Sequence, residues 1–269
     1  MNVDRIDTLI ADLERWFEGV ESCVVAFSGG VDSALVAFLA RRWLGPDRCL
    51  AVVGDSPSLK GRDLATARQF AEQHDIALRV VVTDELAVAD YRANPKDRCF
   101  HCKSELFRRL EAVRQEVGFA CILGGENADD HQDYRPGLRA VAEFSVRGPL
   151  ADCGVTKDEL RAIARRYDLD VAEKPASPCL SSRVPYFSEI TEEKLRQVDA
   201  AESWLADRGF PVARVRHHGP LARVEVPNDR VTDLQAMVQE LSAACAEVGF
   251  EQVEIDPEGF VSGKLNRAL

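Results

Sequence analysis

The stretch Val24-Val25-Ala26-Phe27-Ser28-Gly29-Gly30-Val31-Asp32-Ser33 decides the fold of this chain. Its first part is uninterrupted by polar side chains, which predicts a short buried strand over residues 23–27. A helix is then predicted from Ser33 to Leu44, and Gly45-Pro46 marks its end. The order of strand, glycine-containing loop and helix is typical of sites that bind a phosphate group, although a plain strand-to-helix turn has the same outline.

The polar residues of this loop suit a nucleotide phosphate. Gly29 and Gly30 let the backbone approach an anion closely and adopt a positive φ where one is needed. The N–H groups at the start of the helix point toward such an anion, and the hydroxyls of Ser28 and Ser33 add two donors. Asp32 alone would repel phosphate, so its expected role is to bind a Mg²⁺ ion that bridges the phosphates. The Walker and dinucleotide-binding glycine patterns are both absent.

Strands and helices alternate through the first part of the chain. Further strands are predicted at residues 49–53, 78–82 and 119–123, and helices at 3–19, 61–74 and 103–117. This alternation predicts an α/β fold, with a parallel sheet and helices on both faces. Ligands of such sheets bind beyond the carboxyl ends of the strands, so the loops that follow the predicted strands should carry the chemistry.

The pattern changes after about Pro175. Helices are predicted at 191–208 and 228–248, a hairpin at 212–217 and 221–226, and a last strand at 252–255. We therefore expect two domains, residues 1–180 with the phosphate loop and residues 181–269 as a small α+β domain. The second would serve for substrate binding or oligomerisation.

The bulk composition narrows the class of protein. Hydrophobic residues make up 46% of the chain and the formal net charge is −11. No apolar stretch is long enough for a membrane span, and the first residues do not resemble a signal peptide, so we expect a cytoplasmic protein without a membrane partner. The acidic balance weighs against a nucleic-acid partner, because the long-range field would repel the phosphate backbone.

Three of the eight cysteines stand outside apolar runs in suggestive places. Cys99-Phe100-His101-Cys102 is a C-x-x-C pair just ahead of a predicted helix, and two thiols at this spacing can bind one metal or cluster. Cys179 is the best candidate for a third ligand, and Arg183 is close enough in sequence to favour its thiolate. A redox pair or a structural zinc site remains the alternative for Cys99 and Cys102, and an ordinary surface thiol for Cys179.

Several of these motifs together resemble one known family. Ser28–Ser33 matches the PP-loop of ATP pyrophosphatases, and the remaining stretches extend the match over most of the chain. They are Asp55–Leu59, Asn94–Pro95, Cys99–Leu106, Asn127–Asp130, Asp133–Gly137, Lys174–Ala176 and Cys179–Tyr186. The chain resembles the LarE family of ATP-dependent sulfur transferases, which implies a PP-loop, adenine nucleotide alpha hydrolase-like fold.

The resemblance implies a specific activity. The family adenylates carboxylates of a pyridinium dicarboxylic acid mononucleotide, releases pyrophosphate and replaces AMP with sulfur, which yields thiocarboxylates for the nickel-pincer nucleotide cofactor. Some members give up the sulfur of one cysteine at the position of Cys179. Others hold a [4Fe–4S] cluster on three cysteines, and the presence of Cys99 and Cys102 fits this second branch. A sulfide source and a homo-oligomer are also implied.

Other polar residues have candidate roles. Asp55 and Ser56 end the second predicted strand, where they would contact adenine or ribose or simply form a polar turn. Gly124–Asp130 follows the fourth strand as a magnesium or nucleotide loop or a solvated acidic loop, and its Glu126 departs from the usual family pattern. Arg214 and Arg216 alternate along the hairpin; they would bind the substrate phosphate, or else form a charged solvent face.

Three rival functions share parts of these motifs. A tRNA thiolase also combines the phosphate loop with three cysteines, but it should show a basic groove or an RNA-binding domain. A nucleotide-binding regulatory protein with structural zinc at Cys99 and Cys102 would release no pyrophosphate. An amide-forming PP-loop synthetase would use ammonia, and nothing in the chain resembles a glutaminase domain.

Overall fold

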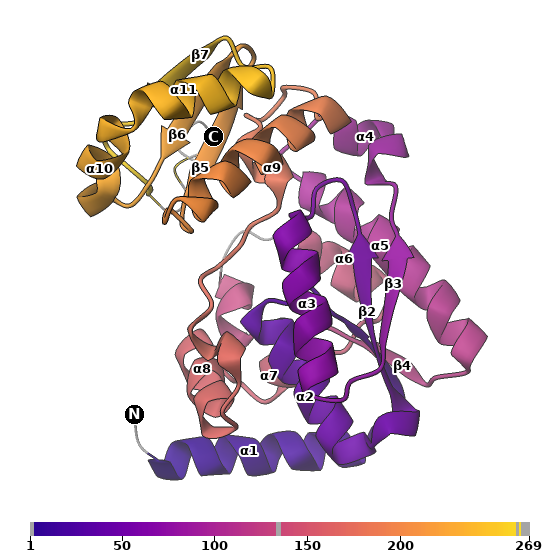
Figure 1. Cartoon of the computed structure of the whole chain (residues 1–269). Coiled ribbons are helices and arrows are strands. Elements are labelled where there is room, and N and C mark those ends of the chain that lie inside the picture. The colour runs from indigo at the N-terminus through magenta and orange to yellow at the C-terminus, as the bar shows by residue number, and fades with distance from the viewer. Residues whose placement is uncertain (1–2, 133–135, 262–263, 265–269) are drawn as a thin grey trace. The chain divides into compact units, whose positions relative to one another are not determined.

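The computed structural model describes residues 3–132, 136–261 and 264 (Figure 1). The chain separates into two compact units. Unit 1 comprises Met1–Glu85 and Asp97–Ser177, and unit 2 comprises Leu86–Lys96 and Pro178–Leu269. Of the family-like stretches, Asp133-Tyr134-Arg135 lies outside the described residues.

Unit 1 is built on a parallel sheet. Its strands are β1 (Cys23–Ala26), β2 (Cys49–Asp55), β3 (Leu78–Val82) and β4 (Cys121–Leu123), in the order β3-β2-β1-β4. Every neighbouring pair is parallel, as the alternation of strands and helices predicted. All four carboxyl ends therefore meet at one edge of the sheet, where the phosphate loop begins.

Helices cover both faces of this sheet. In unit 1 they are α1 (Val3–Glu18), α2 (Val31–Leu44), α3 (Gly61–Gln73), α5 (Arg98–Val117), α6 (Gly137–Glu143), α7 (Pro149–Asp152) and α8 (Lys157–Arg166). Side chains alternate along β1, so Val25 packs with α1, α2 and α8 in one core, whereas Val24 packs with α5 and α6 in another. Both strand faces are buried, which explains the uninterrupted apolar sequence.

One helix begins earlier than the sequence indicated. The predicted helix over 103–117 is α5, which starts at Arg98, so Cys99 and Cys102 lie inside its first turns instead of ahead of it. Short 3₁₀ turns complete the connections along the chain. They are Pro46–Arg48, Glu85–Ala87, Ala128–Gln132, Asp170–Glu173, Leu180–Arg183 and Asn228–Arg230.

Unit 2 is a small α+β unit. Strands β5 (Arg214–His218) and β6 (Leu221–Glu225) form an antiparallel hairpin, and β7 (Gln252–Ile255) pairs parallel to β6. Its helices are α4 (Ala89–Arg92), α9 (Glu192–Asp207), α10 (Val231–Ala236) and α11 (Val238–Glu247), so the predicted helix over 228–248 is divided at Met237. The apolar faces of α9, α10 and α11 share one core with the sheet.

The segment Leu86–Lys96 belongs to unit 2 although it interrupts unit 1 in sequence. Asn94 ties it in place: its side chain is fully buried, and Nδ2 donates to the carbonyl oxygens of Pro185 at 2.7 Å and Ser188 at 3.0 Å. The hydroxyl of Tyr91 also hydrogen-bonds Ser181. Within the residues that the structure describes, no helix is both long and apolar enough to cross a bilayer.

Candidate functional site

The phosphate loop joins β1 to α2 in a conformation that only small residues allow. Gly29 has φ +70°, and a Cβ atom on it would lie 3.0 Å from the Cβ of Ala67. Ser33 Oγ accepts a hydrogen bond from the Ser28 amide at 3.1 Å and donates to the Gly30 carbonyl at 3.2 Å. No side chain caps the start of α2 at Gly30. The N–H groups of its first turn therefore face the site that a phosphate would fill.

Asp32 lies in that first turn between two partners from distant parts of the chain. Asn127 Nδ2 donates to one carboxylate oxygen at 2.9 Å, and Lys157 Nζ pairs with the other at 2.5 Å. Both Asp32 and Lys157 remain partly exposed. A carboxylate at this point fits a Mg²⁺ ligand, because Mg²⁺ prefers oxygen donors and binds proteins through one or two carboxylates next to phosphates.

The loop after β4 packs directly on the phosphate loop. A Cβ atom on Gly125 would come within 2.8 Å of the Ser33 amide nitrogen, so only glycine permits this approach. The Asn127 amide donates to Asp130 at 3.1 Å, and both residues are buried. Asp129 accepts a hydrogen bond from the Lys157 amide at 2.7 Å. Although Asp129 is exposed, the buried Asn127 and Asp130 make the loop a built part of the sheet edge.

Glu126 in the same loop turns toward α5. One of its carboxylate oxygens pairs with Lys103 at 3.2 Å, and Lys103 follows Cys102 directly. The second oxygen is buried with no hydrogen-bond partner among the described residues. This departure from the family pattern therefore links the nucleotide edge of the sheet to the helix that carries the cysteine pair.

Ser56, predicted to contact adenine or ribose, belongs to a network around a buried carboxylate. Glu85 is 1% exposed and accepts hydrogen bonds from Ser56, from Ser58 at 2.6 Å and from Thr83 at 3.1 Å. Asp55 ends β2 beside this network and is exposed. The network fixes the carboxyl ends of β2 and β3 next to each other.

Two lysines of the site had no role assigned from sequence. Lys157 pairs with Asp32, and Lys174 donates to the Gly29 carbonyl at 3.0 Å and pairs with Asp63 at 3.2 Å. No helix was predicted at Lys157 from the sequence; this lysine begins α8 directly after Thr156, and the capping box of Thr156 and Glu159 was the signal that could have found this helix start. Lys174 stood in a family-like stretch. Both add positive charge beside a loop built for phosphate.

The predicted cluster ligands are distributed over both units. Cys99 is exposed and Cys102 is partly exposed, and a spacing of three residues places them on one side of α5. Cys179 is exposed in unit 2 and directly precedes the 3₁₀ turn Leu180–Arg183. All eight cysteines are thiols, which suits soft iron–sulfur ligation. Among the described residues, no three His, Cys, Asp or Glu side chains gather closely enough to hold a metal ion.

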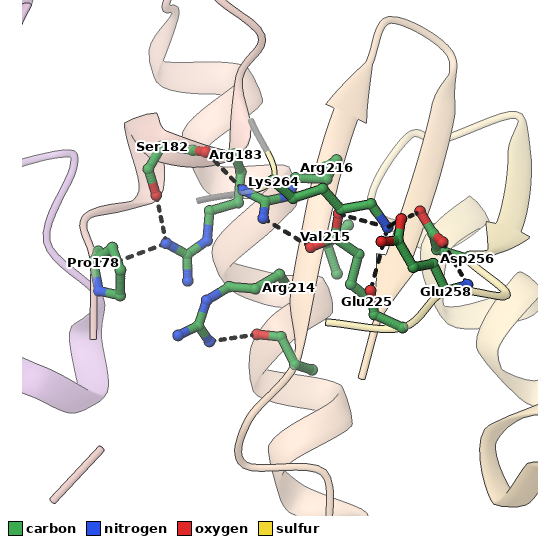
Figure 2. Close-up of polar contacts among 12 residues, drawn as sticks. Pro178, Ser182, Arg183, Arg214, Val215, Arg216, Glu225, Asp256, Glu258 and Lys264 are labelled. Atoms are coloured by element: carbon green, nitrogen blue, oxygen red, sulfur yellow. Dashed lines mark hydrogen bonds and ion pairs between the residues drawn. The ribbon is translucent and has the colours of Figure 1, made fainter. Parts of the chain in front are cut away.

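Arg183 organises the loop that carries Cys179 (Figure 2). Its guanidinium is fully buried and forms a two-point ion pair with Glu202, at 2.7 and 3.0 Å. Its remaining nitrogen donates to the carbonyl oxygens of Pro178 at 2.7 Å and Cys179 at 2.9 Å. Arg183 therefore contacts Cys179 through the backbone, so its direct effect is on the position of that residue.

Arg214 and Arg216 project from the same face of β5 and are both buried. Arg216 pairs with Glu225 at 2.7 Å and donates to the Ser182 carbonyl at 2.9 Å (Figure 2). Arg214 lies over the ring of Phe260, with 5.1 Å between guanidinium carbon and ring centroid. The alternative interpretation of these residues as a charged solvent face is wrong, because a solvent face would leave them exposed.

The electrostatics around Arg214 favour an anion. Burial, and then the positive charges of Arg183 and Arg216, together lower the pKa of Arg214 to about 10 against the opposing effect of Glu202 and Glu225. Because burial destabilises the charged form of this guanidinium, an additional negative charge nearby would stabilise it. Arg183, Arg214, Arg216 and their two carboxylates are called the arginine cluster below.

Comparisons with known proteins first concern the part of the chain that contains the phosphate loop. The sequence model of the NAD synthase family matches residues 6–107, which include the phosphate loop. The solved structure of NMN synthetase from Francisella tularensis is similar in fold, with a TM-score of 0.51 and 19% identity over 65% of this chain and 74% of that one. At this identity the likeness concerns the fold alone.

Two curated relatives match almost the whole chain. An uncharacterised protein of Synechocystis, slr1717, is 41% identical over 98% of this chain and 99% of its own length. The pyridinium-3,5-bisthiocarboxylic acid mononucleotide synthase of Lactiplantibacillus plantarum is 34% identical over 97% of this chain and 94% of its own length. With its PP-loop, its parallel sheet and this full-length similarity, the chain belongs to the LarE family of PP-loop proteins.

Proposed function

We propose that this chain is an ATP-dependent sulfur transferase. It would adenylate the carboxylates of pyridinium-3,5-biscarboxylic acid mononucleotide and convert them to thiocarboxylates, a step toward the nickel-pincer nucleotide cofactor. The observation that carries this proposal is the phosphate loop with Asp32 held between Asn127 and Lys157, in a chain similar along its length to the L. plantarum synthase. The reaction would take place in the cytoplasm, where thiols stay reduced.

The first half-reaction activates the substrate. The amides of Gly29, Gly30 and the first turn of α2 would hold the β and γ phosphates of ATP, with hydroxyl donors from Ser28 and Ser33. Asp32 would bind Mg²⁺, and its release of Lys157 would leave that ammonium group free to contact a phosphate oxygen. A substrate carboxylate oxygen attacks the α-phosphorus, the bond to the β-phosphate breaks, and pyrophosphate leaves. The acyl adenylate then carries AMP, a far better leaving group than a carboxylate oxygen.

The nucleotide base would lie beyond the strand ends at Asp55 and Ser56. The Glu85 network supports this assignment, because it fixes Ser56 and the neighbouring strand ends before ligand arrives. Asp55 is exposed at the same edge and free to meet a ribose hydroxyl in this arrangement.

The second half-reaction delivers sulfur to the activated carbonyl. Cys99, Cys102 and Cys179 would hold a [4Fe–4S] cluster, which when bound offers one iron for an additional sulfide from an external source. The part of this chain is to present three thiolates and to keep the loop of Cys179 in place through Arg183. Loss of sulfur from Cys179 itself is the competing account, and both end with AMP leaving the carbonyl carbon.

The substrate's phosphate monoester would bind at Arg214 and Arg216. Guanidinium groups match phosphate geometry with two parallel hydrogen bonds, and the burial and neighbouring cations that lower the pKa of Arg214 support an anion there. Arg183 is assigned a positioning role, because its donors are engaged with Glu202 and the Cys179 loop. The family likeness also suggests a homo-oligomer as the working form.

Pyrophosphate release tests the activity. With ATP and Mg²⁺, the protein should release pyrophosphate and AMP only when the pyridinium dicarboxylate mononucleotide is added. If pyrophosphate release does not depend on this compound but increases with unmodified tRNA, a tRNA thiolase would be favoured. No release with any substrate would favour a regulatory protein with zinc at the cysteine pair.

Iron content and protein mass test the sulfur source. After anaerobic reconstitution the cluster account expects about four irons per chain, with none retained in Cys99→Ala. It also expects the polypeptide mass to stay constant over many turnovers. Loss of one H₂S from Cys179 per product, in active protein without iron, would reject the cluster and leave adenylation standing.

A further inference from the structure

After β7 the chain returns along the end of β6. The returning residues 256–261, together with Lys264, are called the C-terminal strap. The Phe260 amide donates to the Val226 carbonyl at 2.7 Å. Gly259 has φ +69°, and a Cβ atom on it would lie 2.7 Å from the same carbonyl oxygen. This close approach requires glycine and sets the strap against the strand that carries Glu225.

The strap reaches the arginine cluster first through Phe260. Its ring lies under the guanidinium of Arg214, at 5.1 Å. An aromatic face attracts a cation without cancelling its charge, so the net charge of the site is unchanged. A carboxylate in the same place would stabilise Arg214 but would also repel an incoming anion. Phe260 therefore stabilises Arg214 in a way that keeps its charge available.

Lys264 makes the second connection (Figure 2). Its Nζ lies 2.7 Å from Asp256 and 3.2 Å from Glu258, and 4.0 Å from Glu225. The other oxygen of Glu225 pairs with Arg216 at 2.7 Å. Burial works against the charged form of Asp256, yet the hydrogen bond from Lys264 holds the pKa of that carboxyl below its usual range. The lysine is thus ionically coupled to two acids of the strap and to Glu225, the acid that pairs with Arg216.

Charge balance shows what Lys264 contributes. The three arginines of the cluster exceed Glu202 and Glu225 by one positive charge. The strap adds Asp256 and Glu258, which would turn this surplus into a deficit, and Lys264 offsets one of the two. Among these described side chains the charges then sum to zero, and without the ammonium group the sum around an approaching phosphate would be negative.

We propose that the C-terminal strap completes the anion site: Phe260 and Lys264 keep the charge of Arg214 and Arg216 available to the phosphate monoester of a mononucleotide. Both are positioning residues that act through the arginines. The inference rests on the proposed function, since it takes the arginine cluster as the site of the substrate phosphate.

The test uses nicotinic acid mononucleotide as a probe, because it joins a pyridinium ring to a single phosphate monoester. Calorimetric titration of Lys264→Ala should show about three- to tenfold weaker binding, the effect of one charge several ångströms away at intermediate dielectric. The dependence of log Kd on log salt should also become shallower. Lys264→Arg should restore both, and Phe260→Tyr should retain affinity where Phe260→Leu loses it.

Lys194→Ala is the matched control. This lysine also lies in unit 2, but it donates to Ser188 Oγ at 3.3 Å and to the Glu189 carbonyl at 2.6 Å instead of pairing with an acid of the cluster or the strap. Its removal should leave affinity and salt dependence unchanged. ATP binding at unit 1 should be the same in all variants, and urea denaturation of each variant checks that unit 2 is folded.

Two results separate the strap from the site it serves. If Arg216→Ala weakens probe binding while Lys264→Ala and Phe260→Leu bind like the unmodified protein, the strap inference is wrong and the phosphate site stands. If Arg216→Ala itself binds the probe normally, the phosphate does not lie at the arginine cluster, and both the site assignment and the strap inference are overturned.

Discussion

The two units hold their charged side chains in opposite ways. In unit 1, Asp32 and Lys157 form a single contact and stay partly exposed. In unit 2, the Arg183 side chain is 0% exposed and donates two hydrogen bonds to the Glu202 carboxylate. The first pair can exchange its partner at little cost, whereas separation of the second would leave a buried charge. The difference suggests that the ATP site rearranges its ions on binding and that the arginine cluster is preformed.

The largest effect should follow from Asp32→Asn in the exchangeable pair. The substitution removes the charge proposed to hold Mg²⁺, and metal stabilisation of a phosphoryl transition state is worth several kcal/mol, so pyrophosphate release should fall at least about a hundredfold. Asp75→Asn is the control, because Asp75 pairs with Arg41 on the surface. Native rates of release by the Asp32 variant would remove this residue from the mechanism.

The next test compares how much the ion pairs Lys157–Asp32 and Arg183–Glu202 each contribute to stability. Arg183→Met leaves Glu202 buried without its partner and should lower the free energy of unfolding by about 3–5 kcal/mol. Lys157→Met should cost less than about 1 kcal/mol, since the pair is partly exposed, but it should slow pyrophosphate release. Urea denaturation measures both. Equal losses of stability would abolish the proposed distinction between an exchangeable and a preformed site.

Replacement of both Arg214 and Arg216 by alanine should selectively weaken binding of the pyridinium mononucleotide. Each hydrogen bond to a charged group contributes about 1.5–3 kcal/mol, so affinity should fall roughly ten- to a hundredfold while ATP binding is spared. Arg223→Ala provides the comparison, because this arginine on β6 is partly exposed and pairs with Glu254. A double variant with unchanged substrate affinity would confine these arginines to a structural role.

The smallest effect concerns pH. Burial, and then the charge of Lys194, lower the pKa of His217 below its ordinary value, so the folded protein favours the neutral ring. The unfolded chain binds the proton more readily, and the stability due to neutral His217 is therefore lost as pH falls below about 6.5. One such group changes stability by at most about 1.4 kcal/mol per pH unit. Between pH 7.5 and 5.5, the free energy of unfolding should fall less for His217→Gln than for the unmodified protein, as measured by denaturation at both pH values.

Local pattern was sufficient to predict the parallel sheet and the phosphate loop. The apolar strands, Gly29, Gly30 and Ser33 lie within one short stretch, and their roles depend on neighbours in sequence. The cysteine pair was predicted as a pair, but α5 begins at Arg98, because no strong start signal separates the two cysteines from the helix that follows.

Long-range partners could not be predicted in the same way. Lys157 is 125 residues from Asp32, and Lys174 is 145 residues from Gly29, so spacing offers no information on either contact. Alternation of Arg214 and Arg216 showed a shared face, yet a solvated face and a buried ion-pair network produce the same alternation. The passage of Leu86–Lys96 into unit 2 depends on Asn94 finding carbonyl oxygens some ninety residues away.

Under the proposed function, the contact between Lys157 and Asp32 would make nucleotide binding an ion-exchange reaction. The carboxylate already has a counter-ion, so Mg²⁺·ATP would displace an ammonium group instead of entering a bare negative site. The displaced ammonium would stay near the loop, because the Lys157 amide is bonded to Asp129 at the start of α8. One cation would thus replace another on Asp32, and the first could turn toward the phosphates.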